Sequence, residues 1–171
     1  MRKTRLVAGL LPGAALLALT IALPAAAEAA TATSTLNVTA TVTANCIVST
    51  TALAFGNVNT LSGANVDGSG GLSITCTNGT AWSAAAGLGS GSGASFASRR
   101  MSSGANLLSY NLYTGAARTI VWGDGTSGTG TFTGSGTGAA QSIAVYGRVG
   151  AGQTNVPAGA YADTVTVTVT Y

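Results

Sequence analysis

The segment Tyr161-Ala-Asp-Thr-Val-Thr-Val-Thr-Val-Thr-Tyr171 alternates apolar and polar residues up to the last position of the chain. One face of this segment, if extended, carries Tyr161, Val165, Val167, Val169 and Tyr171, and the other carries Thr164, Thr166, Thr168 and Thr170. A period of two predicts a half-buried β-strand. Because the alternation has no closing turn, we expect the neighbour of this strand to come from elsewhere.

A second segment with the same alternation lies near the other end of the chain. Its apolar positions are Leu36, Val38, Ala40, Val42, Ala44 and Cys46, and its polar positions are Asn37, Thr39, Thr41, Thr43 and Asn45. The pattern predicts another β-strand. Two such strands without caps, one near each end, suggest a protein that assembles with other molecules.

Residues 1–30 have the three regions of a secretory signal peptide: Met1-Arg-Lys-Thr-Arg5, an apolar run over 6–23, and small residues over 24–30. We expect cleavage near residues 27–30. A retained membrane anchor is the alternative, but Gly9, Pro12 and Gly13 interrupt the apolar run. The remaining residues have the length of one domain.

Charge is nearly balanced once the leader is set aside. The charged residues after position 30 are Arg99, Arg100, Arg118 and Arg148 against Asp67, Asp124 and Asp163. With no lysine and no basic run, this composition argues against nucleic-acid binding. Low charge with abundant Gly, Ser, Thr and Ala also makes long amphipathic helices improbable and predicts an all-β fold.

Cys46 and Cys76 are the only cysteines. A secreted chain enters an oxidising compartment, so we expect a disulfide between them. It would stabilise the fold by roughly 3 to 4 kcal/mol in the chain-entropy model. A metal or redox pair lacks support because the chain has no CxxC motif and no histidine.

The rest of the chain predicts about eight short strands, which indicates a sandwich of two sheets or a single sheet closed on itself. A hairpin is expected from 72–76 and 80–86 around Asn78-Gly79, a strong turn signal. Further strands are expected at 107–113, 118–122 and 141–149. By composition 62–71 is a surface loop, and 123–138 is a long loop or a pair of short edge strands.

Catalytic and ligand sites are poorly supported. The sequence offers no histidine and widely spaced aspartates, so we expect no enzyme, no cofactor and no small-molecule substrate. Gly123-Asp-Gly-Thr-Ser-Gly128 matches GxGxxG but is followed by no helix-forming segment, so we expect a loop. The turn at 65–68 has one aspartate, too few oxygens for calcium. The arginines are interpreted as surface donors to carbonyls or aspartates.

Six aromatic residues could form a carbohydrate-binding stripe, but their strand-like surroundings favour packing in the core. They are Trp82, Trp122, Tyr110, Tyr113, Tyr146 and Tyr161.

Several short motifs, in order from about residue 35 to the C-terminus, resemble the spore coat protein U domain family. This is also the fold of the major rod subunits of archaic, Csu-type chaperone–usher pili. The matching pieces are Ala44-Asn-Cys46, Phe55-Gly56, Leu72-Ser-Ile-Thr-Cys-Thr-Asn-Gly79, Arg100-Met101, Leu108-Ser-Tyr-Asn-Leu-Tyr113, Val145-Tyr-Gly-Arg148 and the segment 158–171.

The resemblance implies an incomplete, immunoglobulin-like antiparallel β-sandwich over residues 44–171, with a donor strand at 31–43. A periplasmic chaperone fills the groove left by the missing strand, and the donor strand of a neighbouring copy later replaces it at an outer-membrane usher. The donor residues would be Leu36, Val38, Ala40 and Val42, and the acceptor edge would be Val165, Val167, Val169 and Tyr171.

The function implied is a structural subunit of a secreted surface pilus or fibre, as in cell adhesion and biofilm formation. The alternative is a coat or binding module of the same fold, adhesin-like, whose own N-terminal strand fills its own groove. The first predicts oligomers and the second a monomer.

Overall fold

The computed structural model describes residues 28–171. The predicted signal peptide, apart from its last three residues, lies outside the described residues. In the described part, no helix has the length and apolar character needed to span a membrane. The contacts divide the chain into two units, Met1–Thr39 and Ala40–Tyr171. All strands of the described residues lie in the second unit, and residues 28–45 form neither helix nor strand.

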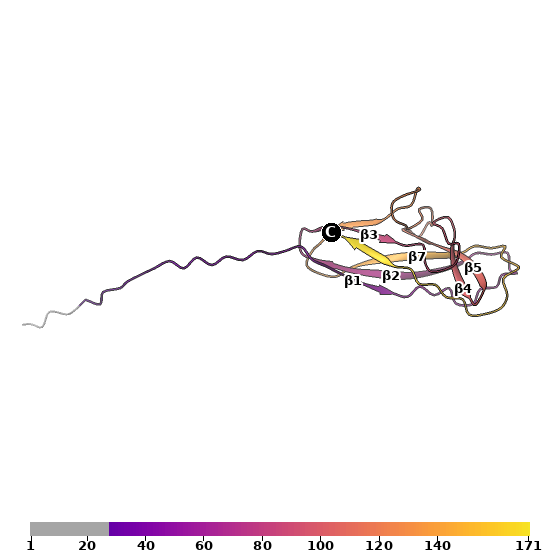
Figure 1. Ribbon diagram of the computed structural model, residues 1–171, viewed down its shortest axis with the longest axis horizontal. Coiled ribbons are helices and arrows are strands. Elements are labelled where there is room, and N and C mark those ends of the chain that lie inside the picture. Colours follow the sequence, from indigo (N-terminus) through magenta and orange to yellow (C-terminus); the bar gives the residue numbers. More distant parts are fainter. Residues whose placement is uncertain (1–27) are drawn as a thin grey trace, which may run out of the picture. The chain divides into compact units, whose positions relative to one another are not determined.

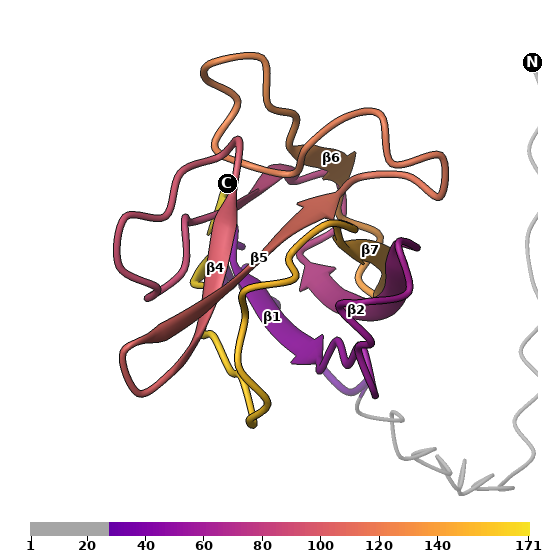
Figure 2. The ribbon, with the colours of Figure 1, turned by 90° about the vertical axis from the view of Figure 1, so that its right-hand side faces the viewer.

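Two antiparallel sheets build the second unit (Figures 1 and 2). The strands are β1 (Cys46–Thr51), β2 (Val66–Cys76), β3 (Ala81–Ala86), β4 (Arg99–Ser103), β5 (Asn106–Tyr113), β6 (Phe132–Ser135), β7 (Gln141–Val149) and β8 (Val167–Thr170). The first sheet has the order β1-β2-β7-β5-β4, and the second has the order β6-β3-β8. This arrangement confirms the predicted all-β antiparallel sandwich.

The core lies between the sheets and consists of alternate residues of their strands. It contains Leu72, Ile74, Cys76, Trp82, Ala84, Ala86, Leu108, Tyr110, Leu112, Trp122, Val145 and Val149. Both indole nitrogens donate within the sandwich, from Trp82 to Gln141 Oε1 at 3.3 Å and from Trp122 to the Ala84 carbonyl at 3.0 Å. For these two tryptophans and Tyr110 the packing interpretation is confirmed, because all three are buried.

The prediction of a loop over 62–71 is wrong in its second half, because β2 begins at Val66. Gly68 lies opposite Gly147 in β7, and together these glycines leave room for two side chains. A Cβ at Gly147 would lie 2.9 Å from atoms of both Leu53 and Phe55. Glycine is used here for close packing against the sheet, whereas its abundance alone suggested a loop.

The predicted hairpin around Asn78-Gly79 is also wrong. The turn exists, since the Thr80 amide donates to the Thr77 carbonyl at 3.0 Å and Gly79 has a φ of 79°. However, β2 belongs to the first sheet and β3 to the second. The inward residues of both strands share one core cluster, so the turn carries the chain across the sandwich instead of along one sheet.

The predicted strand 118–122 forms only isolated bridges, from Tyr113 to Val121 and from Trp122 to Gly130. The segment 123–138 contains a loop and one short strand, β6. The final alternating segment is split: Ala162 bridges Ser102 of β4 in the first sheet, and only Val167–Thr170 pairs with β3. The predicted N-terminal strand is not formed before Cys46, since residues 28–45 are in neither helix nor strand.

Candidate functional site

Each sheet ends in a strand that is paired on one side only. The first sheet has β1 and β4 as its edge strands, and the second has β6 and β8; β1 and β8 are the two that concern the groove. Residues of both strands, Thr50 and Thr51 from one and Val167 from the other, line the same groove. The two open edges therefore flank a single opening of the sandwich.

The groove between these edges has a volume of about 1200 Å³. Residues 50–61 form one wall and residues 156–165 with Val167 form the other. Its floor includes Leu108, Leu112 and Val145, which belong to the core. The groove thus gives access to apolar side chains that a complete sandwich would cover.

The backbone of β8 presents free hydrogen-bonding groups along this groove. The Gly87 amide donates to the Thr166 carbonyl at 2.9 Å, and Ala85 and Thr168 are the next paired residues in that register. In an antiparallel strand, successive residues direct their backbone groups to opposite sides. Thr166, Thr168 and Thr170 therefore face β3, while the backbone groups of Val165, Val167, Val169 and Tyr171 face the open edge.

The inner face of β1 lacks a covering layer. Val48 pairs with Ile74 of β2, so the two side chains point to the same face. Ile74 is 0% exposed but Val48 is 41% exposed. A residue on the core side of a sheet that remains this accessible indicates that an element is missing above it.

Two of the four predicted acceptor residues lie in the groove. Val165 and Val167 line it, while Val169 and Tyr171 do not. Val169 is half-buried against the core, and Tyr171 is 56% exposed, its hydroxyl donating to Asn45 Oδ1 at 3.4 Å. The groove therefore extends along the entry of β8 and does not reach the end of this strand.

The predicted donor residues are fully available for contact. Leu36, Val38 and Val42 are 87%, 84% and 83% exposed, and Ala40 is exposed as well. Exposed large apolar side chains at alternate positions represent unburied surface that a partner could cover.

The disulfide between Cys46 and Cys76 is present and joins residues directly opposite each other in β1 and β2, with a Cα–Cα distance of 4.1 Å. Thr77 continues this connection. Its amide donates to the Asn45 carbonyl at 2.9 Å, and its hydroxyl accepts from the Asn45 amide at 3.1 Å. The backbone immediately before β1 is thereby held beside the end of β2.

Sequence reasoning missed the role of Arg99. It was expected at the surface, but its side chain is 0% exposed and donates to the carbonyls of Gly87 at 2.8 Å and Trp122 at 2.7 Å. Burial lowers the pKa of its guanidinium. The signal in the sequence was the position of Arg99 two residues before Met101, which places both side chains on the same face of a strand. In the structure Arg99 lies opposite the buried Tyr110, so this face points into the sandwich.

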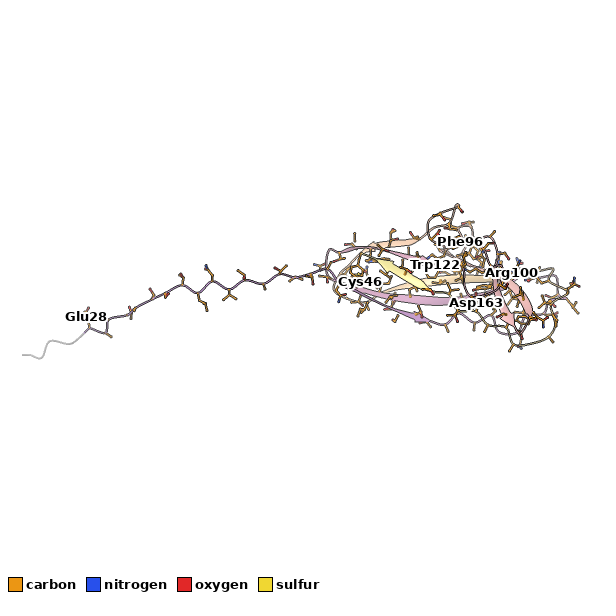
Figure 3. The ribbon with its side chains drawn as sticks, in the orientation of Figure 1. Glu28, Cys46, Phe96, Arg100, Trp122 and Asp163 are labelled. Atoms are coloured by element: carbon orange, nitrogen blue, oxygen red, sulfur yellow. A yellow bond between two sulfur atoms is a disulfide. The ribbon has the colours of Figure 1, made fainter. Side chains whose placement is uncertain are left out.

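Asp163 was also missed. It accepts hydrogen bonds from the Tyr110 hydroxyl at 2.6 Å and from the Ser90 amide and hydroxyl at 2.6 and 2.7 Å. Burial raises the pKa of the Asp163 carboxyl, but the bonds from Tyr110 and Ser90 outweigh burial and hold this pKa below its usual value. Figure 3 shows Cys46 at one end of the sandwich and Asp163 with Arg100 toward the other.

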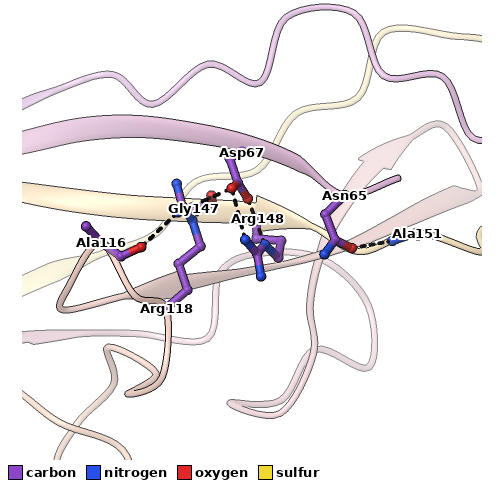
Figure 4. Close-up of polar contacts among 7 residues, drawn as sticks. All are labelled: Asn65, Asp67, Ala116, Arg118, Gly147, Arg148 and Ala151. Atoms are coloured by element: carbon purple, nitrogen blue, oxygen red, sulfur yellow. Dashed lines mark hydrogen bonds and ion pairs between the residues drawn. The ribbon is translucent and has the colours of Figure 1, made fainter. Parts of the chain in front are cut away.

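The other arginines match the prediction of surface donors. Arg148 forms two bonds with Asp67, at 2.7 and 2.9 Å, and Arg118 lies 3.2 Å from the same carboxylate (Figure 4). The hydrogen bond from Arg148 is the main cause of a lowered pKa for Asp67. In the same region Asn65 Oδ1 accepts from the Ala151 amide at 3.0 Å. These contacts tie surface strands and loops together.

The GxGxxG segment is a loop, as predicted. Asp124 accepts from the amide and hydroxyl of Thr126 at 2.9 and 2.7 Å, and no helix follows. Within residues 28–171 no group of three or more His, Cys, Asp or Glu side chains could hold a metal ion.

Comparisons with known proteins agree with this architecture. The sequence model of the Spore Coat Protein U domain matches residues 32–168. Protein U of Myxococcus xanthus is 41% identical over 160 residues, covering 85% of this chain and 88% of that protein.

A solved structure is similar as well: a chain of the CsuC–CsuE chaperone–tip adhesion subunit pre-assembly complex from archaic chaperone–usher Csu pili of Acinetobacter baumannii, with a TM-score of 0.55 and 23% identity. The match covers 77% of this chain but only 40% of that chain. At this identity the likeness is one of fold, and it supports the predicted immunoglobulin-like, pilin-type sandwich.

Proposed function

The chain belongs to the Spore Coat Protein U domain family, and on that premise we propose that it is a secreted structural subunit of a surface pilus or fibre. Residues 31–43 act as the donor strand of each subunit, and residues 44–171 form the acceptor domain. The subunit passes through the periplasm and is assembled at the cell surface.

The observation that carries the proposal is the unpaired edge of β8 above an apolar groove of about 1200 Å³. An added strand would bond to the free backbone groups of Val165, Val167, Val169 and Tyr171. Its alternate side chains would enter the groove, which is the mode of β-strand addition. The half-exposed Val48 on β1 would be covered in the same event.

The donor segment matches this edge in length. Leu36 to Val42 and Val165 to Tyr171 each span six residue steps, about 20 Å of extended chain. Burying the three large donor side chains would contribute about 1.5 to 3 kcal/mol each, before the cost of association. This sum is comparable with the cost of association, about 4 to 15 kcal/mol, so the backbone hydrogen bonds of the added strand must contribute as well.

The partners follow from the exposed edge. Neither donor nor acceptor segment carries a charge between 36 and 42 or between 164 and 170. A flat uncharged edge aggregates unless it is covered. We infer that a periplasmic chaperone covers it during transit and that an outer-membrane usher exchanges the chaperone for the next subunit.

The alternative is a self-complemented coat or binding module, in which residues 36–42 fill the groove of their own domain. Residues 43–45 would then be the connection between the filling strand and β1. The bonds between the Thr77 and Asn45 backbones and from the Asn45 amide to the Thr77 hydroxyl, which itself lies 3.4 Å from the carbonyls of both Thr43 and Asn45, hold this backbone along the end of β2. These contacts favour exchange between copies.

The test is the molar mass of the oxidised chain without its leader, measured by light scattering on a sizing column, with and without residues 31–43. The proposal predicts a ladder of oligomers that disappears on truncation, leaving a folded domain. A stable monomer that loses its fold on truncation would establish the self-complemented alternative instead.

A further inference from the structure

We propose that Arg99 and Asp163 form a clamp that fixes the start of β8 while the groove is empty, so that an incoming strand meets a preformed edge. The clamp joins residues 87–90, which follow β3, to residues 163–166, which lead into β8. This inference rests on the proposed function, since it concerns how the acceptor edge is kept ready.

The Arg99 half of the clamp acts on Gly87. Two nitrogens of the guanidinium donate to the Gly87 carbonyl, Nε at 3.0 Å and Nη2 at 2.8 Å. The amide of the same glycine donates to the Thr166 carbonyl at 2.9 Å. The amide of Gly87 therefore forms the last backbone bond between the end of β3 and the chain that enters β8. The carbonyl of the same glycine is held by the buried guanidinium of Arg99.

The Asp163 half acts three residues before Thr166. Asp163 Oδ1 accepts from the Ser90 amide and from the Thr164 amide at 2.6 and 2.7 Å, and Oδ2 accepts from the Tyr110 hydroxyl at 2.6 Å. The carboxylate thus connects the entry of β8 to the loop after β3 and to β5. Asp163 also lines the groove.

The two halves meet through β4 and β5. Arg99 and Tyr110 are opposite each other in the register of these strands, and Arg99 Nη1 donates to Asn111 Oδ1 at 2.8 Å. Asn111 in turn donates to the Phe96 carbonyl at 2.8 Å. The arginine and the carboxylate are therefore anchored to the first sheet, while the chain that they hold enters the second.

Close packing at Gly89 supports the assignment. This glycine has a φ of 92°, and a Cβ there would overlap the carboxylate of Asp163. The loop can approach Asp163 only because this position has no side chain.

Burying a guanidinium in a core costs desolvation free energy, and this cost is offset only when its N–H donors form hydrogen bonds. A purely packing role is better served by an apolar residue of similar volume. Two of the nitrogens, Nε and Nη2, donate to Gly87, whose own amide bonds Thr166 at the entry of β8. This distribution indicates a positioning role at that point.

The experiment measures amide hydrogen exchange in the full chain without its leader, in the monomeric fraction, together with binding of a synthetic peptide of residues 31–45. The variants are Arg99→Met, Asp163→Asn and Gly89→Ala. Arg100→Met is the matched control, since Arg100 is the neighbour of Arg99 and donates only to the Ser92 carbonyl, at 3.2 Å, in an exposed contact.

We expect exchange of the Thr168 and Thr170 amides to accelerate about tenfold to a hundredfold in the three variants, as for the loss of a charge-assisted hydrogen bond. Amides of Val145 and its neighbours in β7 should change little, peptide association should slow, and Arg100→Met should behave as wild type.

Equal acceleration of amide exchange in β7 and β8, or unchanged peptide association despite faster exchange of the β8 amides, would overturn the clamp. Failure of the peptide to bind wild type, with the exchange pattern intact, would instead count against the proposed function. If Arg99→Met does not fold, the other two variants decide the question.

Discussion

Replacing Val38 with aspartate should block assembly without affecting the acceptor domain. Val38 is 84% exposed in the free chain, so nearly all of its side chain is available for burial when it docks in a groove. Loss of that burial costs about 1.5 to 3 kcal/mol. A carboxylate forced into an apolar groove adds a penalty of several kcal/mol, or must be protonated.

A total of about 4 kcal/mol corresponds to roughly a thousandfold weaker association. Val38→Ala removes about two methylene equivalents, about 1.6 kcal/mol, and should weaken association by roughly one order of magnitude. Thr39→Asp is the matched control, because it adds the same charge one residue away, on the opposite face of the strand. It should change association less than about threefold, as for a surface substitution.

The assay compares molar-mass distributions of the variants by light scattering at equal concentration, with thermal melting of each chain beside it. The expected order of polymer yield is wild type and Thr39→Asp, then Val38→Ala, then Val38→Asp, with similar melting temperatures. If Val38→Asp polymerises like wild type, or if Thr39→Asp blocks assembly equally, the alternation of the donor segment has no role in docking and the assignment is refuted.

Replacing Cys46 and Cys76 with serine should lower the free energy of unfolding by about 3 to 4 kcal/mol, measured by urea denaturation, given their separation of 30 residues; an unchanged midpoint would contradict this. Gly147→Val should cost about 1 to 3 kcal/mol by the same measurement, because its side chain would meet two apolar side chains, while Gly150→Val, in open space, should cost less. The lowered pKa of Asp163 means that its contribution to stability is complete above the ordinary value near 3.8 and is lost as pH falls through the native pKa. Between pH 5 and 2 the melting temperature of Asp163→Asn should therefore fall less than that of wild type, and parallel curves would exclude this contribution.

Local alternation was sufficient to predict several elements of the fold. It predicted β7 at the residues observed, and the strand expected at 107–113 corresponds to β5. These predictions succeeded because the period of side-chain direction is a property of the strand itself. The disulfide followed from the compartment and the cysteine count.

Features that depend on a distant neighbour were not predictable in the same way. The Asn78-Gly79 signal specifies a tight turn, but whether the next strand stays in its sheet depends on which partner each strand finds. Gly68 lay in a segment that its composition predicted to be a loop, whereas this glycine and Gly147 accommodate Leu53 and Phe55. The burial of Arg99 depends on carbonyls from other segments, whose positions no local pattern records.

The absence of edge protection in both alternating segments connects the fold to the proposed assembly. Natural sheets protect an open edge with charges, prolines, bulges or a covering element. Residues 164–170 contain no charge and no proline, although Val165 and Val167 of this segment line an apolar groove. Residues 36–42 are equally uncharged, and their large apolar side chains are exposed. A charge on the apolar face of either segment would protect the free subunit but would also be buried in the joined strands at a cost of several kcal/mol. On the proposed function, an edge that must later be covered cannot carry such a charge on its apolar face, and the proposed chaperone would protect it before assembly.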